Sequence, residues 1–279
     1  MKFGLIGNPV AHSLSPNLFR AAYPNNNHTY ELILTSDPEE AVNLLIKGGF
    51  TAVNVTAPIK TSILPFIQKQ TPECVAIGAC NLVLKQGDTL VAHNTDYIGV
   101  TNSITKVEIS MINAVCLLLG AGGAAKAAAY ALLQLGSGLI WANRTLAHIP
   151  DSFNGSFIIT VPLSEAVHHL QACNIIINTL PLSIPDTDVF TFHAHHTVFD
   201  ASYVARPLEE QAIQAGAKYL GGERWLLHQA IPSFEAMTGI VPNIYAMEDV
   251  ITFCHYPNIP YFSGKLKNDY GTEQSDAHR

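Results

Sequence analysis

Residues 114–125 read AVCLLLGAGGAA, an apolar run that leads directly into a turn of glycine and alanine. Gly120, Gly122 and Ala125 match the spacing G-x-G-x-x-[G/A], in which the glycines permit a tight turn and close approach of a pyrophosphate to the backbone. An Ala-rich segment typical of a helix follows, and its first N–H groups can bind an anion. We interpret the stretch as a strand, a dinucleotide-binding turn and a helix. The alternative is that the small residues serve tight packing alone.

The longer segment 114–142 has one charged residue, Lys126, which raises the question of a membrane span. Glycines at 120, 122, 123, 136 and 138 fall at turn positions, and Asn143-Arg144 ends a second strand-like run. A membrane helix needs about 20 uninterrupted apolar residues. We therefore predict an α/β unit and no membrane partner.

Asn143-Arg144-Thr145 stands where an NAD-binding unit often carries an acid for the ribose hydroxyls, about 20 residues after the turn. No carboxylate is present there. Arg144 can pair with a 2′-phosphate and stack on adenine, which favours NADP over NAD. The alternative is a solvated arginine after a strand.

The first part of the chain alternates strand and helix patterns, which predicts a mostly parallel sheet with an antiparallel edge. We expect strands at 2–6, 30–34 and 52–56, helices at 16–22, 38–47 and 58–68, and a hairpin of 81–84 with 89–92 around Gly87. A helix over 97–105 and a polar stretch at 106–113 follow.

The second part repeats the alternation, which predicts another parallel sheet. We expect strands at 114–119, 139–142, 157–161, 175–178, 197–199 and 217–220, and helices at 124–135, 163–172, 208–215, 223–238 and 243–254.

Composition limits the function. Of 279 residues, 48% are hydrophobic and 13% charged, so the chain buries a large core. A net charge of −7 argues against nucleic-acid binding. The five scattered cysteines lack metal-ligand spacing and suit a reducing cytosol, and the N-terminal apolar run is too short for a signal peptide. We expect a cytoplasmic protein.

Two charged side chains follow predicted strands. Residues 54–60 read NVTAPIK, and Asp96 closes the motif Asn94-Thr95-Asp96. Lys60 and Asp96 are candidates for an acid/base pair acting on a hydroxyl or ketone. The alternatives are a surface lysine in the first turn of helix 58–68, and an aspartate that caps helix 97–105.

Ser13 and Ser15 precede Pro16 at a predicted helix start. Ser15 is the expected N-cap, and two hydroxyls at a helix N-terminus can also bind a carboxylate.

These segments together resemble the shikimate dehydrogenase family, nearly over the full length, to about residue 250. The matching motifs are Gly7–Pro16, Asn54–Lys60, Ile77–Asn81, Asn94–Asp96, and the glycine turn with Asn143-Arg144-Thr145. The resemblance implies reversible reduction of 3-dehydroshikimate to shikimate with NADPH, in aromatic amino-acid biosynthesis, with Lys60 and Asp96 as the catalytic pair and no metal. It implies substrate binding by Ser13, Ser15, Thr56, Asn81, Tyr203 and Gln229, and NADP binding by Gly120, Gly122, Gly123, Ala124, Asn143, Arg144, Thr145 and Thr179.

With this resemblance, the predicted fold class is α/β with two α/β domains, and the active site lies in the cleft between them. The substrate domain is expected at 1–100, completed by 222–256, the Rossmann-like doubly wound NADP domain at 101–221, and a polar extension at 257–279. Leu82 and Tyr97 depart from the family pattern, which leaves open whether the protein prefers shikimate or quinate. Pro232 is expected to kink the helix that carries Gln229.

Other interpretations stay open. One is a quinate/shikimate dehydrogenase that uses NAD, and another is a non-catalytic relative that only binds nucleotide and ligand. His193, His195 and His196 suggest a zinc site, but no acid or cysteine motif completes four ligands. The oligomeric state is not determined, and a homodimer is one alternative.

Overall fold

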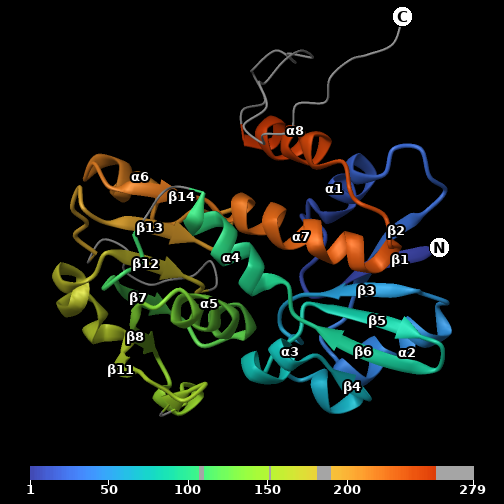
Figure 1. The fold of residues 1–279 in the computed structure, drawn as a ribbon, viewed down its shortest axis with the longest axis horizontal. Helices are drawn as coiled ribbons and strands as arrows, with labels where there is room; N and C mark the ends of the chain where they lie inside the picture. Colours follow the sequence, from blue (N-terminus) through green and yellow to red (C-terminus); the bar gives the residue numbers. More distant parts are fainter. Residues whose placement is uncertain (107–109, 151, 181–189, 256–279) are drawn as a thin grey trace, which may run out of the picture.

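The computed structural model of the protein describes residues 1–106, 110–150, 152–180 and 190–255. Two six-stranded sheets lie side by side along the long axis, and α4 (Asp96–Thr105) and α7 (Gly222–Thr238) run between them (Figure 1). The predicted α/β class with two sheets is confirmed. The predicted extension at 257–279 lies outside the described residues, as do residues 107–109 of the polar stretch at 106–113.

The N-terminal sheet has the order β2-β1-β3-β5-β6-β4. Its strands are β1 (Lys2–Gly7), β2 (Thr29–Leu34), β3 (Ala52–Val55), β4 (Lys69–Gln70), β5 (Leu82–Gln86) and β6 (Thr89–His93). β5 is antiparallel to both β3 and β6, whereas the other pairs are parallel. The expectation of an antiparallel edge is therefore wrong, because the short strand β4 pairs with β6 and leaves β5 in the interior.

The helices of this half are α1 (Ser15–Ala22), α2 (Pro38–Lys47) and α3 (Pro72–Ile77). The predicted helix at 58–68 does not form. Residues 57–63 are turns, and only Leu64–Phe66 form a short 3-10 helix, η1. Pro65 explains this, because it lacks an N–H and disfavours helical backbone at the residue before it.

The sequence interpretation missed α3, although its end signals are present. The Thr71 side chain accepts a hydrogen bond from the N–H of Cys74 at 3.3 Å, and Pro72 is the first helical residue. Gly78 ends the helix in the left-handed region at a φ of 67°.

The second sheet is entirely parallel and has the order β11-β8-β7-β12-β13-β14. Its strands are β7 (Val115–Leu119), β8 (Gly138–Asn143), β11 (Ile159–Pro162), β12 (Ile175–Asn178), β13 (Thr197–Asp200) and β14 (Lys218–Leu220). In chain order this arrangement is 3-2-1-4-5-6, that of dinucleotide-binding proteins, in which ligands bind beyond the carboxyl ends of the strands at the point where the order reverses. Here that point lies between β7 and β12.

The connecting elements are α5 (Gly123–Gln134), η2 (Leu146–His148), η3 (Leu163–Ala172), α6 (Glu209–Gln214) and α8 (Ile244–His255). The helix predicted at 163–172 has 3-10 geometry. The strand predicted at 157–161 begins later, at Ile159, because residues 156–157 (β10) pair with 152–153 (β9) in a small hairpin.

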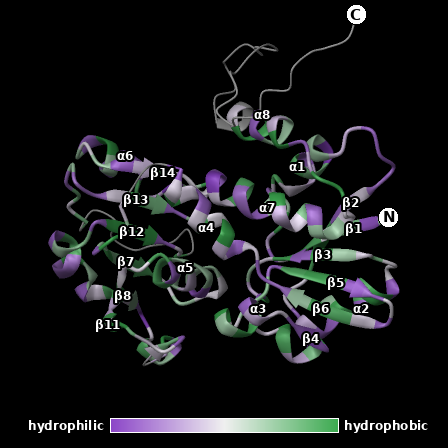
Figure 2. Cartoon of the chain, viewed as in Figure 1, coloured by the Kyte–Doolittle hydropathy of each residue, from purple (hydrophilic) through white to green (hydrophobic). Residues whose placement is uncertain are grey.

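Apolar side chains gather on the central strands and the helix faces that cover them (Figure 2). Trp225 of α7 packs into the core of the second sheet, whereas Leu227 and Phe234 of the same helix pack into the core of the first. α7 therefore joins the two halves, and it continues past Pro232 to Thr238. Within the described residues, no helix is long and apolar enough to cross a membrane.

Candidate active site

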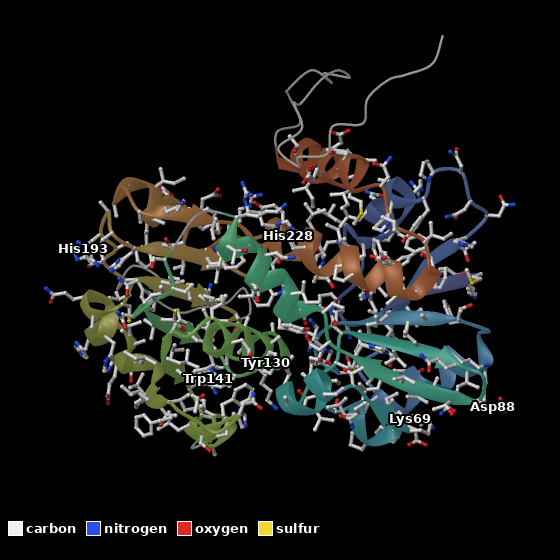
Figure 3. All side chains as sticks on the ribbon, viewed as in Figure 1. Lys69, Asp88, Tyr130, Trp141, His193 and His228 are labelled. Carbon is white, nitrogen blue, oxygen red and sulfur yellow. The ribbon has the colours of Figure 1, made fainter. Side chains whose placement is uncertain are left out.

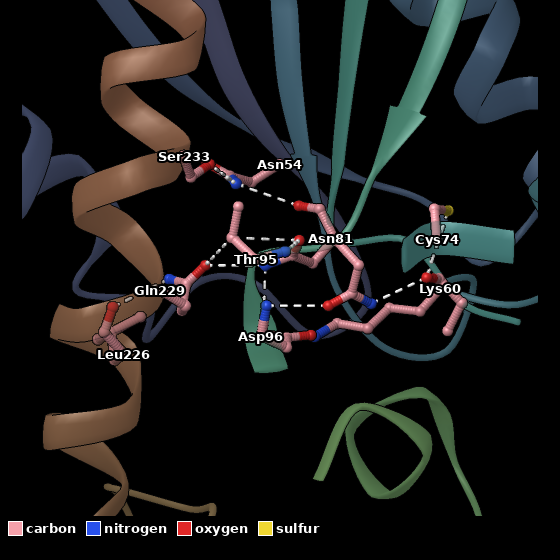
Figure 4. Close-up of polar contacts among 11 residues, drawn as sticks. Asn54, Lys60, Cys74, Asn81, Thr95, Asp96, Leu226, Gln229 and Ser233 are labelled. Atoms are coloured by element: carbon pink, nitrogen blue, oxygen red, sulfur yellow. Dashed lines mark hydrogen bonds and ion pairs between the residues drawn. The ribbon is translucent and has the colours of Figure 1, made fainter. Parts of the chain in front are cut away.

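Lys60 and Asp96 form an ion pair at the boundary between the two halves. The Lys60 Nζ lies 2.5 Å from Oδ2 of Asp96, and their side chains are 16% and 6% exposed (Figure 4). Lys60 lies in the turns after β3, and its carbonyl oxygen accepts a hydrogen bond from the N–H of Cys80 at 2.8 Å. It is therefore neither a surface lysine nor part of a helix.

Asp96 is the first residue of α4, and Thr95 occupies the N-cap position. The N–H of Asp96 donates to Oδ1 of Asn94 at 2.9 Å, while the Asp96 carboxylate faces Lys60 and Asn81. The capping alternative for Asp96 is therefore wrong, because the carboxylate bonds to side chains from other elements rather than to its own helix.

Asn81 joins the pair to α7. Its Nδ2 donates to Oε1 of Gln229 at 2.9 Å, to Oγ1 of Thr95 at 2.9 Å and to Oδ1 of Asp96 at 3.2 Å. Its Oδ1 accepts from the N–H of Thr95 at 2.7 Å. Side chains from the residue before β5, from the start of α4 and from α7 thus converge on one polar site (Figure 4).

Three residues at this site were not predicted. The hydroxyl of Tyr30 donates to Oδ1 of Asn54 at 2.8 Å, and Nδ2 of Asn54 donates to the hydroxyl of Ser233 at 2.7 Å. Asn54 could have been found, because it is a polar residue in a strand that is buried throughout. Burial raises the pKa of Tyr30, and hydrogen bonding with Ser15 opposes that rise, so Tyr30 links this group to Ser15.

The two serines face each other at the start of α1. The Ser13 hydroxyl donates to the Ser15 hydroxyl at 3.1 Å and accepts from the Ser15 N–H at 3.2 Å. Ser15 is not the N-cap: the helix starts at Ser15, and Leu14 stands before it without a capping side chain. The two hydroxyls therefore form one connected pair at the start of α1.

Two further expected residues lie around this group. Thr56 follows β3 and is partly buried, and its N–H donates to the carbonyl oxygen of Ile6 at 2.9 Å. Tyr203 lies in the loop after β13, close enough to Tyr30 to add to the rise in its pKa. The carboxylate of Asp200 anchors this loop, because it accepts hydrogen bonds from Asn178 at 2.8 Å and from the N–H of Leu208 at 3.1 Å.

The glycine turn has the features that a pyrophosphate requires. Gly120 has a φ of 102°, and a Cβ there would lie 2.6 Å from Oγ1 of Thr179, so only glycine fits. At Gly122 an added Cβ would meet no described atom within 4 Å, which leaves the N-terminus of α5 open. The fold can therefore accept an anion at this helix end.

At the end of β8, the Asn143 side chain donates to the carbonyl oxygen of Thr145 at 2.9 Å. Arg144 and Thr145 are exposed. Asn143 thus closes the turn in which the exposed Arg144 stands.

The three clustered histidines do not join this site. His193 lies at the outer end of the second sheet (Figure 3), before β13, whereas the site is at the carboxyl ends of the strands. Nδ1 of His196 accepts from the N–H of His193 at 3.1 Å, and its Nε2 lies 3.1 Å from the carbonyl oxygen of Leu170. Both ring nitrogens are thus engaged within the protein. No group of His, Cys, Asp and Glu across the described ranges has a metal-holding arrangement.

Known proteins are similar to this chain in sequence and in structure. A family model for the shikimate dehydrogenase substrate binding domain matches residues 5–83. The NADP(+) shikimate dehydrogenase of Carboxydothermus hydrogenoformans is 32% identical over 273 residues, which cover 89% of this chain and 95% of the relative. That of Staphylococcus epidermidis is 33% identical and covers 90% and 97%.

Solved structures agree with the sequence relatives. The shikimate dehydrogenase of Thermus thermophilus in complex with NADP(H) and shikimate superposes with a TM-score of 0.76 at 28% identity, over 90% of this chain and 98% of that one. Another shikimate dehydrogenase, in complex with NADP+, has a TM-score of 0.79 at 27% identity, with 90% and 94% covered. With the paired lysine and aspartate, the glycine turn and near full-length similarity, the chain belongs to the shikimate dehydrogenase family.

Proposed function

We propose that the protein catalyses the reversible, NADPH-dependent reduction of 3-dehydroshikimate to shikimate. The observation that carries this proposal is the largely buried Lys60–Asp96 ion pair, whose Lys60 stem packs beside Gly123, the first residue of the dinucleotide helix α5. A proton donor and a hydride donor can thus act on the same carbonyl group. NADP(+) shikimate dehydrogenases 32–33% identical to this chain support it.

The substrate domain is proposed at residues 1–100 with 222–256, and the NADP domain at 101–221. In the first, Ser13 and Ser15 would bind the substrate carboxylate. The ring hydroxyls would be bound by Thr56, Asn81, Asp96 and Gln229, with Tyr203 closing over the ring. NADP would be held by Gly120, Gly122, Gly123, Ala124, Asn143, Arg144, Thr145 and Thr179.

NADPH, when bound, supplies the hydride to the ketone carbon. The Lys60 ammonium donates a proton to the ketone oxygen, which becomes the hydroxyl of the product. Asp96 holds the Lys60 Nζ in place and accepts a hydrogen bond from a neighbouring hydroxyl of the ring. In the oxidative direction, Lys60 must first lose a proton to solvent, and its neutral amine then accepts the proton from the alcohol.

We propose a cytoplasmic location and a role in aromatic amino-acid biosynthesis, where this reaction belongs. Four buried cysteines are free thiols, which suits a reducing compartment: Cys74, Cys80, Cys116 and Cys173. A homodimer stays a prediction, which analytical ultracentrifugation tests.

The test of the function is to follow NADPH absorbance with the purified protein. NADP reduction with shikimate, and NADPH oxidation with 3-dehydroshikimate, are expected at rates of an ordinary enzyme. Faster turnover of quinate with NAD would assign the alternative specificity. NADPH binding without turnover of either acid would make the protein a non-catalytic relative and contradict the proposal.

A further inference from the structure

Gly123 touches the stem of Lys60. A Cβ added at Gly123 would lie 2.8 Å from Cβ of Lys60, 3.2 Å from its Cδ and 3.3 Å from Cβ of Ala79. Ordinary carbon contacts are about 3.5–4.0 Å. In Figure 4 the green ribbon of the α5 region lies below the Lys60 stem, while the Lys60 Nζ at the end of that stem contacts Asp96.

Neither the backbone conformation nor the dinucleotide spacing requires a glycine at residue 123. Gly123 is the first residue of α5, and its φ lies outside the left-handed range that L side chains avoid. The dinucleotide spacing uses Gly120, Gly122 and Ala125 and leaves residue 123 unrestricted. Alanine is also the better helix former. The missing side chain is therefore explained by the close approach of Lys60.

The contact cannot be relieved by a change of rotamer. The Cβ of Lys60 is fixed by its backbone, whose carbonyl oxygen accepts a hydrogen bond from the N–H of Cys80. Ala79 is fully buried, in a small core that includes Ala127 of α5. An added methyl group would force apart the turn that holds Lys60 and the start of α5.

We propose that Gly123 is a positioning residue, which sets the place of the Lys60 ammonium relative to the dinucleotide turn. The expected effect on kcat rests on the proposed function. The packing of Gly123 against Lys60 does not depend on that function. Because α5 starts at Gly123, the element that binds the cofactor also defines where the proton donor sits. A displacement of about 1 Å in such a group can lower the rate roughly 100-fold.

The test compares Gly123→Ala with the control Gly138→Ala. A Cβ at Gly138 would approach no described atom closer than 3.8 Å. Two measurements are made on each variant and the wild type. One is kcat, with the Kd for NADPH. The other is amine labelling of Lys60 by reductive methylation, quantified by peptide mass spectrometry against exposed Lys69.

Gly123→Ala is expected to lower kcat by roughly 10- to 100-fold and to raise Lys60 labelling several-fold. The Kd for NADPH should change less than kcat, because alanine keeps the backbone N–H that residue 123 offers to the cofactor. Gly138→Ala should change none of these. A weaker NADPH affinity with unchanged kcat would overturn the proposal, since Gly123 would then serve the pyrophosphate. Unchanged Lys60 labelling in Gly123→Ala would overturn the positioning proposal. Labelling is measured without any substrate, so this result is independent of whether the proposed function is correct.

A double-mutant cycle with Lys60→Met tests whether Gly123→Ala lowers kcat through the Lys60 ammonium. Methionine keeps the stem that Gly123 touches but removes the ammonium. Adding Gly123→Ala to Lys60→Met should lower kcat no further, and an equal further loss would contradict the proposal. If Gly123→Ala alone does not fold, Lys60→Gly in that background removes both clashing carbons and is expected to restore folding. Failure to restore it would also count against the proposal.

Discussion

The indole Nε1 of Trp141 donates a 2.6 Å hydrogen bond to the carbonyl oxygen of Gly120. Trp141 is fully buried in β8, and Gly120 is the first glycine of the dinucleotide turn. The neighbouring strand β8 therefore supports the dinucleotide turn through the Trp141 indole. The glycine spacing in the sequence gives no indication of this contact.

Trp141→Phe is expected to reduce both stability and cofactor affinity. The buried carbonyl oxygen of Gly120 loses its partner, at a cost of about 1–3 kcal/mol in the free energy of unfolding. Urea unfolding and NADPH titration measure the two effects. Trp225→Phe is the matched control, because Trp225 is another buried tryptophan of the same core cluster and lies outside the dinucleotide turn. Equal loss of NADPH affinity in both variants would argue against a role for the Trp141 bond.

Lys60→Met is expected to lower kcat by roughly 10²–10⁴, the usual scale for a lost general acid. The Kd for shikimate should change less, because the serines and Asn81 remain in place. Single-turnover kinetics and shikimate titration separate the two quantities. Lys69→Met, at an exposed site of the same domain, is the control. Undiminished turnover would remove Lys60 from the mechanism.

Arg144→Ala is expected to weaken NADPH binding and leave NADH binding almost unchanged. A hydrogen bond to a charged group contributes about 1.5–3 kcal/mol, so the KM for NADPH should rise roughly 10- to 100-fold. Arg144 is exposed, so the fold should not suffer. Arg20→Ala, at another exposed site, controls for the change in charge. If NADH and NADPH lose affinity equally, Arg144 does not recognise the 2′-phosphate.

His228 is expected to make the protein less stable in mild acid. Burial, together with the nearby positive charges of Lys106 and Arg224, lowers the pKa of His228 to about 4. Its pKa in an unfolded chain is about 6.5, so between these values the unfolded state binds the proton and is favoured as the pH falls. The loss from pH 7 to about pH 5 should be about 2 kcal/mol.

His228→Gln should remove this part of the pH dependence. Urea unfolding at the two pH values measures it, with the same substitution at exposed His168 as the control. An unchanged slope of stability against pH in His228→Gln would show that other groups are responsible.

Local patterns of residues were enough for much of the fold and for the candidate site. Buried apolar runs and turn glycines predicted the strands of the second sheet, and the helix predicted at 38–47 has the bounds of α2. The glycine spacing and the two strand-end motifs identified the dinucleotide turn, Lys60 and Asp96 because these signals lie within a few consecutive residues.

The packing of distant segments settled the remainder. Asn81 and Gln229 are 148 residues apart, and their hydrogen bond exists only because α7 returns to the first sheet. The interior position of β5 and the contact of Gly123 with Lys60 have the same origin. Periodicity reports which face of a segment is buried, whereas the neighbour that covers that face is chosen by the folded chain as a whole.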